Sequence, residues 1–253
     1  MSAERPLEAA RASRLIGEGL PLLALLSGGA DSVCLLDVCL RLEADLSALH
    51  VNYGLREGAD ADEAHCRALC ERLEVPLAVE RVRLAAGGNL QERAREARYA
   101  LAERHAIGDF AAAHTASDQA ETVLYRLAAS PGRRALLGME PRRGRLVRPL
   151  LGVTRAETRA YCEARGLRWR EDPSNEDPRF ARARVRHGLL EALREVAPAA
   201  ERNVAETALL LRDEAELLER AVDEALAALG GGPAVSLAEL RPLPLALARL
   251  VLR

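Results

Sequence analysis

The chain has 253 residues, of which 49% are hydrophobic and 29% charged, which excludes a wholly disordered protein and is enough for a folded core. All 36 basic residues are arginine, and with 38 acidic residues they leave a formal charge of −2. Without lysine the chain can hold neither a Walker-type phosphate loop nor a Schiff-base lysine. The sequence has no apolar run of about 18 residues and no signal-peptide pattern, so we expect no membrane partner.

The first half of the chain alternates short apolar runs with amphipathic segments. We expect strands over 20–26, 46–52, 77–82 and 110–115, and helices over 32–42, 60–73, 90–105 and 117–129. Four such strand–helix repeats predict an α/β fold built on a doubly wound parallel sheet. In that fold the ligand crevice lies at the carboxyl ends of the strands.

The second half changes character. Thr154 and Glu157 form a capping-box pattern that predicts the start of a helix, and the Pro-rich and Asn-containing stretch 171–178 predicts a loop. A long helix is expected over 199–229, ended by three glycines. We therefore expect one domain over 1–198, a linker helix over 199–232 and, over 233–253, the start of a second domain that is truncated.

The five cysteines (Cys34, Cys39, Cys66, Cys70 and Cys162) include no C-x-x-C pair. Most of them lie within apolar helical patterns, where a small buried thiol is the usual explanation. We expect no iron–sulfur or other cysteine-ligated metal site, and a cytoplasmic protein.

The strongest local motif is Ser27-Gly28-Gly29-Ala30-Asp31-Ser32, directly after the first expected strand. Its two glycines let the backbone turn tightly, and the amides at the start of the following helix favour an anion, with the two serines as further donors. An ordinary strand–helix turn would use similar residues. However, a carboxylate in an anion site is costly unless a cation comes with it. We therefore predict a polyphosphate site, with Mg²⁺ held by Asp31.

A second motif follows the fourth expected strand. Asp118 and Glu121 are three residues apart, so both carboxylates lie on one face of a helix, where they suit an ammonium group. Thr115 and Asp118 also form a capping-box pattern, so the spacing alone leaves a structural role equally open. His114 is either a core histidine or a group close to the reacting centre.

The Ser-Gly-Gly-x-Asp-Ser motif resembles the PP-loop of the ATP pyrophosphatase superfamily, whose members cleave ATP between the α and β phosphates. Three further segments, His50 to Arg56, His114 to Thr122 and Glu171 to Asn175, follow in the order typical of the tRNA(Ile)-lysidine synthase family. The resemblance covers about residues 20–190. The sequence departs from the family pattern at four positions, which are Tyr53, Ser117, Ala183 and Glu191.

This resemblance implies a ligase that uses ATP and Mg²⁺ to join free L-lysine to C2 of the wobble cytidine of tRNA(Ile) with a CAU anticodon, through an adenylated tRNA. It implies ATP binding by residues 27–32 together with His50, Asn52 and His114, and lysine binding by Asp118 and Glu121. The implied catalytic residues are Asp31, His114, Asp118 and Arg184. The resemblance also implies that residues 1–198 form the PP-loop catalytic domain and that residues 233–253 begin a tRNA-binding domain.

Two arginine-rich segments predict where RNA binds. Residues 131–148 carry six arginines and one acid, and residues 179–187 carry four arginines and no acid. Such clusters bind a phosphate backbone, whereas the scarcity of aromatic residues argues against base stacking. The candidate tRNA contacts are Arg56, Arg133, Arg134, Arg142, Arg143, Arg182 and Arg186. The sequence leaves a homodimer open.

Two other functions are compatible with a PP-loop. A tRNA thiolase would place sulfur on a base and would need a reactive cysteine or a cluster, against which the missing C-x-x-C pair argues. A non-catalytic ATP-binding module would not need the carboxylates of Asp118 and Glu121. The mass of the product tRNA separates the three functions.

Overall fold

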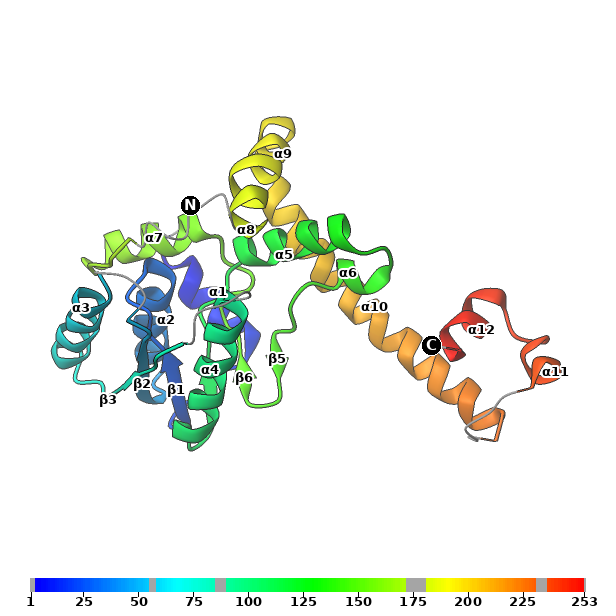
Figure 1. Cartoon of the computed structure of the whole chain (residues 1–253), viewed down its shortest axis with the longest axis horizontal. Coiled ribbons are helices and arrows are strands. Elements are labelled where there is room, and N and C mark those ends of the chain that lie inside the picture. The colour runs from blue at the N-terminus through cyan, green and yellow to red at the C-terminus, as the bar shows by residue number, and fades with distance from the viewer. Residues whose placement is uncertain (1–2, 55–57, 85–89, 172–180, 231–235, 253) are drawn as a thin grey trace.

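The computed structural model describes residues 3–54, 58–84, 90–171, 181–230 and 236–252. Helices cover both faces of a central sheet, and a long helix, α10, extends away from it (Figure 1). This arrangement confirms the predicted α/β class.

The sheet contains β1 (Pro21–Leu25), β2 (Asp45–Asn52), β3 (Leu77–Arg81), β4 (Asp109–Ala111), β5 (Arg142–Arg143) and β6 (Leu146–Val147). The strand order is β3-β2-β1-β4-β6-β5, and every neighbouring pair is parallel except β5 with β6. The order reverses between β1 and β4, which is where a doubly wound sheet opens a crevice. The hairpin of β5 and β6 was not expected, and β4 is shorter than the predicted strand over 110–115.

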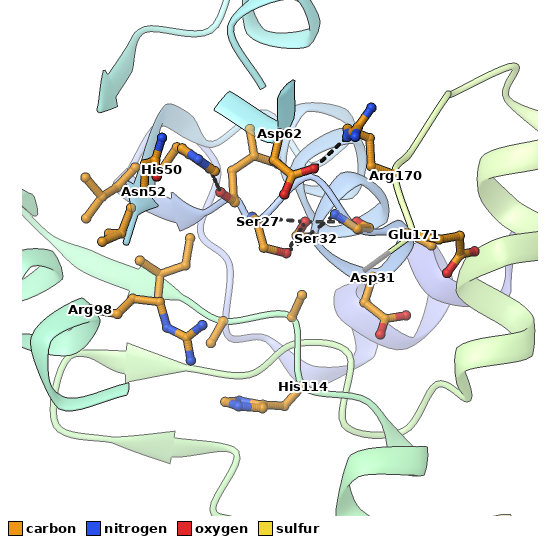
Figure 2. A pocket seen from close by; sticks show the side chains of 18 of the residues that line it. Ser27, Asp31, Ser32, His50, Asn52, Asp62, Arg98, His114, Arg170 and Glu171 are labelled. Carbon is orange, nitrogen blue, oxygen red and sulfur yellow. Dashed lines mark hydrogen bonds and ion pairs between the residues drawn. The ribbon is translucent and has the colours of Figure 1, made fainter. Parts of the chain in front are cut away.

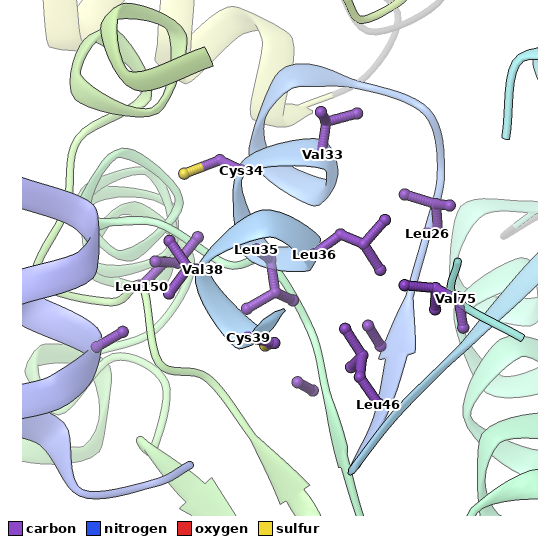
Figure 3. Close-up of a cluster of buried hydrophobic side chains, with 14 of the residues drawn as sticks. Leu26, Val33, Cys34, Leu35, Leu36, Val38, Cys39, Leu46, Val75 and Leu150 are labelled. Carbon is purple, nitrogen blue, oxygen red and sulfur yellow. The ribbon is translucent and has the colours of Figure 1, made fainter. Parts of the chain in front are cut away.

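One face of the sheet is covered by α1 (Arg5–Ser13), α2 (Ala30–Arg41), α3 (Ala59–Arg72) and α7 (Arg155–Ala164). Helix α2 is almost enclosed, because Val33, Leu36 and their neighbours pack on Leu26, Leu46 and Val75 (Figure 3). Burial of such side chains contributes about 1.5–3 kcal/mol each, so this cluster fixes α2 at the end of β1.

The other face of the sheet is covered by α4 (Leu90–His105), whose Leu101 and Ala102 pack on Leu23, Leu49 and Phe110. Successive residues along a strand therefore face opposite helix layers, because side chains alternate between the two faces of a sheet. Because α4 crosses to this face between β3 and β4, the segments that follow β1 and β4 lie side by side at the crevice.

The remaining helices are α5 (Ala116–Ala129), α6 (Arg133–Leu136), α8 (Ala181–Arg184), a π-helical turn η2 (Val185–Leu189), α9 (Leu190–Val196), α10 (Ala200–Ala228), α11 (Leu237–Leu240) and α12 (Leu245–Val251). Helix α10 confirms the long helix expected over 199–229 and packs against α5. The proposed domain boundaries stay a prediction. Among the described residues, no helix is both long and apolar enough to cross a membrane.

Candidate functional site

A cavity of about 500 Å³ opens at the carboxyl ends of β1, β2 and β4, in the predicted place. Ser27 follows β1, His50 and Asn52 end β2, and His114 follows β4, so each reaches the cavity from a strand end (Figure 2). The arginines that line it are Arg98, Arg155, Arg159, Arg170 and Arg186. The fold therefore brings the three predicted motifs together around one opening.

The loop between β1 and α2 is held by the hydroxyl of Ser32. Its Oγ accepts hydrogen bonds from the backbone N–H groups of Ser27 (3.2 Å) and Gly28 (3.1 Å), and donates to the carbonyl of Gly29 (2.9 Å). Only Gly28 has a positive φ, +89°, whereas Gly29 is extended and is the N-cap of α2. The Ser32 hydroxyl thus shapes the loop, and Ser32 lines the cavity with the rest of the first turn of α2, so its contact with ATP stays a prediction.

Asp31 lies in that first turn. Its Oδ1 accepts a hydrogen bond from Thr158 Oγ1, and its Oδ2 is 3.6 Å from Arg155 Nε. Burial, together with the negative charge of Asp118, raises the pKa of Asp31 to about 6. Within the described ranges, no group of three or more His, Cys, Asp or Glu side chains could hold a metal by itself.

The structure confirms the capping-box interpretation of the Asp118 motif, whereas lysine binding stays a prediction, since neither Asp118 nor Glu121 lines the cavity. The capping box is formed, since Asp118 Oδ2 accepts from the Thr115 N–H (2.9 Å) and the Thr115 hydroxyl bonds back to the Asp118 N–H. The second carboxylate oxygen faces the neighbouring Arg155 at 2.9 Å. Burial disfavours the ionised form of Asp118, but Arg155 and the Thr115 bonds outweigh it and hold the pKa below its usual value.

Arg155 joins three carboxylates and was missed from the sequence. Its guanidinium reaches Asp31, Asp118 and Glu121 from the first turn of α7. Glu121, with 1% of its side chain exposed, is also bound by Arg186 at 2.7 Å. One signal was available: an arginine in the first turn of a helix opposes the helix dipole, so a strong anionic partner was to be expected.

His114 is held in its neutral form. Arg148, which is 3% exposed, donates from Nε to His114 Nδ1 at 3.1 Å. Burial and the neighbouring arginine charge lower the pKa of His114 to about 3, although the Asp118 charge opposes them. An imidazole that accepts at Nδ1 carries its proton on Nε2, so His114 is a hydrogen-bond donor on its other side.

His50 and Asn52 line the cavity while also holding the strand end. A ring nitrogen of His50 is 2.9 Å from the Leu26 carbonyl oxygen. The Asn52 amide donates to Asp60 (3.1 Å) and Glu63 (3.0 Å) and accepts from the Gly54 N–H. Their polar atoms therefore position the end of β2, and their contact with ATP stays a prediction.

Arg170 is a second residue that sequence reasoning missed. Its N–H donates to the Gly28 carbonyl at 2.9 Å, and its Nε is 2.5 Å from Asp62 Oδ1 (Figure 2). These bonds tie the segment before the Glu171 motif to the phosphate loop. The rest of that motif, residues 172–175, lies outside the described residues.

The arginines that were predicted to contact tRNA or the reaction intermediate lie in different parts of the structure. Arg186 lies in the main cavity and pairs with Glu121, and its contact with tRNA stays a prediction. Arg184 lines a second cavity of about 300 Å³ with Tyr125 and Leu189 instead of the main one. Arg142 pairs with Asp109 at 2.8 Å, whereas Arg134, Arg143 and Arg182 are exposed. Arg133 is half-buried, and Arg56 lies outside the described residues.

At the four positions that depart from the family pattern, three side chains form a hydrogen bond or an ion pair and the fourth is buried. The Tyr53 hydroxyl donates to the Ala94 carbonyl, and Ser117 Oγ accepts from the backbone N–H of Arg155 at 2.9 Å. Ala183 is buried, and Glu191 pairs with Arg194 on α9. Ser117 thus anchors the first residue of α7 beside the carboxylates.

All five cysteines are buried and none lines the cavity. Burial raises the pKa of Cys39 to about 12, and burial with the neighbouring Cys70, Asp62 and Glu63 charges does the same for Cys66. Burial also raises the pKa of Cys70 to about 11. These groups stay protonated near neutral pH, which makes them poor nucleophiles.

Comparison with known proteins places these features in a family. The chain is 45% identical to a tRNA(Ile)-lysidine synthase of Pseudomonas aeruginosa over 204 residues, which cover 76% of the chain and 46% of that protein. It is 42% identical to the enzyme of the same name from Thermus thermophilus, with 81% of the chain and 42% of that protein covered. The chain thus spans about half the length of these relatives.

A solved structure shares the fold. A U34-tRNA thiolase from Methanococcus maripaludis superposes with a TM-score of 0.66 at 16% identity, over 83% of this chain and 78% of that one. The family model of the PP-loop domain matches residues 10–193, which include the whole sheet and the loop of Ser27 to Ser32. The chain therefore belongs to the PP-loop domain family.

Proposed function

We propose that this chain carries the catalytic part of a tRNA(Ile)-lysidine synthase. The observation that carries the proposal is that Arg155, which lines the cavity together with the loop of Ser27 to Ser32, is paired with both Asp118 and Glu121, so the two carboxylates lie directly behind the cavity wall. A polyphosphate site beside paired carboxylates fits a reaction between an ATP-activated group and a cationic amine. The curated relatives at 42–45% identity bear the name of this activity.

The first step joins the O2 atom of the wobble cytidine to the α-phosphorus of ATP and releases pyrophosphate. The loop of Ser27 to Ser32 and the first turn of α2 would hold the phosphates, because amides at a helix start favour anions. Asp31 fits Mg²⁺, which binds through one or two carboxylates plus phosphate oxygens and water, and which would neutralise phosphate charge. The neutral His114 donates from Nε2 toward an oxygen of the reacting groups.

The second step forms a bond between the lysine ε-nitrogen and C2 of the cytidine and expels AMP. The amine must lose a proton to become nucleophilic, and we assign the role of proton acceptor to Asp118. Glu121 stays paired with Arg186, so it supplies charge for orienting the ammonium. Arg184 was predicted to steady the charged intermediate. Among the described arginines of residues 181–187, Arg186 is the one that lies in the main cavity.

The thiolase alternative is disfavoured by the cysteines. Such an enzyme would need a reactive thiol or a cluster near the nucleotide, and all five thiols of this chain are buried away from the cavity. The similarity to a thiolase structure at 16% identity concerns the fold alone. A homodimer and a cytoplasmic location stay predictions.

The test is to incubate the chain with tRNA(Ile) bearing a CAU anticodon, ATP, Mg²⁺ and lysine, and to weigh the RNA. We expect a gain of one lysine less one water, with AMP and pyrophosphate formed in equal amounts. An exchange of oxygen for sulfur with a sulfur donor would support the thiolase. An unchanged RNA that still binds ATP would support a non-catalytic module.

A further inference from the structure

One guanidinium occupies the carboxylates that the proposed function assigns to lysine. Arg155 places one terminal nitrogen 2.9 Å from Asp118 Oδ1 and the other 3.2 Å from Glu121 Oε1. Its Nε is 3.6 Å from Asp31 Oδ2, on the side of the phosphate loop. An ammonium group cannot take the same oxygen atoms while the guanidinium is there.

The charges around the proposed lysine site are already balanced. Asp118 and Glu121 carry two negative charges, and Arg155 and Arg186 carry two positive ones. Only 17% of the Asp118 side chain and 22% of each arginine are exposed. A third cation added here would be buried without a counter-charge, which costs several kcal/mol per ion.

Arg155 cannot leave by losing its proton. Burial opposes its charge, but Asp118, Glu121 and Asp31 outweigh burial and raise its pKa above the ordinary arginine value. The guanidinium must therefore move toward another anion. Its backbone is fixed, since the N–H is bonded to Ser117 Oγ, so the movement is a rotation of the side chain.

A polyphosphate on the loop of Ser27 to Ser32 supplies that anion. Asp31 belongs to this loop and is already one of the three partners of Arg155. Arginine binds phosphate oxygens in pairs through its planar fork, which makes a nucleotide a stronger partner than one carboxylate oxygen. Mg²⁺ on Asp31 would also repel the guanidinium from this carboxylate.

Resting on the proposed function, we propose that Arg155 is a positioning residue that closes the lysine site until the nucleotide enters. In the free protein its guanidinium covers Asp118 and Glu121. When ATP binds, the guanidinium turns to the phosphates and releases Asp118 Oδ1, while Glu121 keeps its pairing with Arg186. Lysine binding then follows nucleotide binding, and the two ligands strengthen each other.

The test measures lysine binding by calorimetry to the full chain, with and without a non-hydrolysable ATP analogue and Mg²⁺. For the wild type we expect the analogue to tighten lysine binding by about 5- to 150-fold. Arg155→Gln should bind lysine in the absence of the analogue, and the analogue should change its affinity for lysine little. Arg155→Lys, a point charge that cannot span three carboxylates, serves as a second variant should the first not fold, and should show a reduced coupling.

The matched control is Arg104→Gln, which removes an exposed arginine of α4 that does not line the cavity. In this variant the ATP analogue should tighten lysine binding as much as in the wild type. Equal lysine affinity with and without the analogue in the wild type would overturn the role of Arg155 and leave lysine binding intact. The role of Arg155 would also be overturned if the analogue tightened lysine binding in both Arg155 variants as much as in the wild type. Absence of lysine binding in every protein and condition would instead contradict the lysine site, and with it the proposed function.

Discussion

The side chain of Arg148 donates from Nε to Nδ1 of His114 at 3.1 Å, so a buried cation faces an imidazole that has to stay neutral. Arg148 is fixed in turn by its bond to the Glu140 carbonyl at 2.6 Å. This pair decides both the charge and the tautomer of His114, and therefore what His114 can do beside a nucleotide.

We predict that His114 does not titrate between about pH 5 and pH 8, since its pKa is lowered to about 3. Arg148→Met removes one of the arginine charges, so the pKa of His114 should rise, while burial keeps it below its usual value near 6.5. The chemical shifts of the imidazole nitrogens, measured by NMR as a function of pH, give the pKa of His114 in the wild type and in the variant. A wild-type titration near pH 6.5 would contradict the assignment.

Asp31→Asn should raise stability while abolishing pyrophosphate release. In the native state the pKa of Asp31 is about 6, above its ordinary value of 3.8, so the folded protein binds more protons between these values. Stability therefore falls as the pH rises from about 4 to about 6, and the loss persists above 6. The variant removes a penalty of up to about 3 kcal/mol near neutral pH.

The measurement for Asp31→Asn is urea unfolding of both proteins at about pH 4 and about pH 8. The difference in the free energy of unfolding should be small at the lower pH and large at the higher one. A variant less stable than the wild type at about pH 8 would show that the Thr158 and Arg155 contacts outweigh burial.

Gly28→Ala and Gly29→Ala should differ although the residues are adjacent. Gly28 has a φ of +89°, and a Cβ there would lie 3.3 Å from Cys66 Sγ, so alanine is strained in a packed place. We expect a loss of about 1–2 kcal/mol in stability and weaker nucleotide binding. At Gly29 a Cβ would meet Ser27 Oγ at 3.7 Å and the Arg170 carbonyl at 3.9 Å, which are ordinary contacts.

Gly29→Ala is thus the control for the fold, and its unfolding free energy should stay within about 0.5 kcal/mol of the wild type. Any loss of nucleotide binding in this folded variant then reports how closely the phosphates approach the backbone. Equal destabilisation by both substitutions would contradict the conformational argument.

Asp118→Asn should weaken lysine binding and spare the adenylation of tRNA. The amide forgoes a charge-assisted hydrogen bond of roughly 1.5–3 kcal/mol, which is about 10- to 150-fold in affinity. It also weakens the capping box of α5. Glu157→Gln is a matched control, because Glu157 caps α7 in the same way at a place away from the cavity.

Both substitutions should lower the melting temperature, but only Asp118→Asn should let adenylated tRNA accumulate in the presence of lysine. If Asp118→Asn makes no adenylate yet binds lysine normally, the residue belongs to the nucleotide site. Unchanged lysidine formation would leave Asp118 with its capping role alone.

RNA binding should depend on the exposed members of the arginine segment 131–148. Arg145 is held by the Gly108 carbonyl and Arg148 is buried on His114, so neither is available to RNA. The double variant Arg134→Gln/Arg143→Gln should flatten the plot of log K against log salt by about 0.7–0.9 for each RNA phosphate that is no longer neutralised. Arg142→Gln, which removes the partner of Asp109, should flatten it less. An unchanged slope in the double variant would place these arginines away from the RNA.

The sequence by itself determined the local features. The helix after His114 and its Thr115–Asp118 capping box were predictable, because a capping box involves residues three positions apart. The alternation of apolar runs and helical patterns determined the parallel sheet, and the order of the strands brought the phosphate loop and the His114 segment to one edge. Strands β5 and β6 were missed, since two residues are too short to show a period of two.

Only the tertiary structure decided how the charges pair. Arg155 reaches Asp118 across 37 positions of the chain, and Arg186 reaches Glu121 across 65. Such contacts depend on where α7 and the η2 turn lie relative to α5. The place of Arg155 in the first turn of a helix indicates an anionic partner, but no local pattern says which carboxylate it is. The sequence could name the carboxylates of the site, but their partners follow from packing, because electrostatic pairing is set by distance in space and by burial.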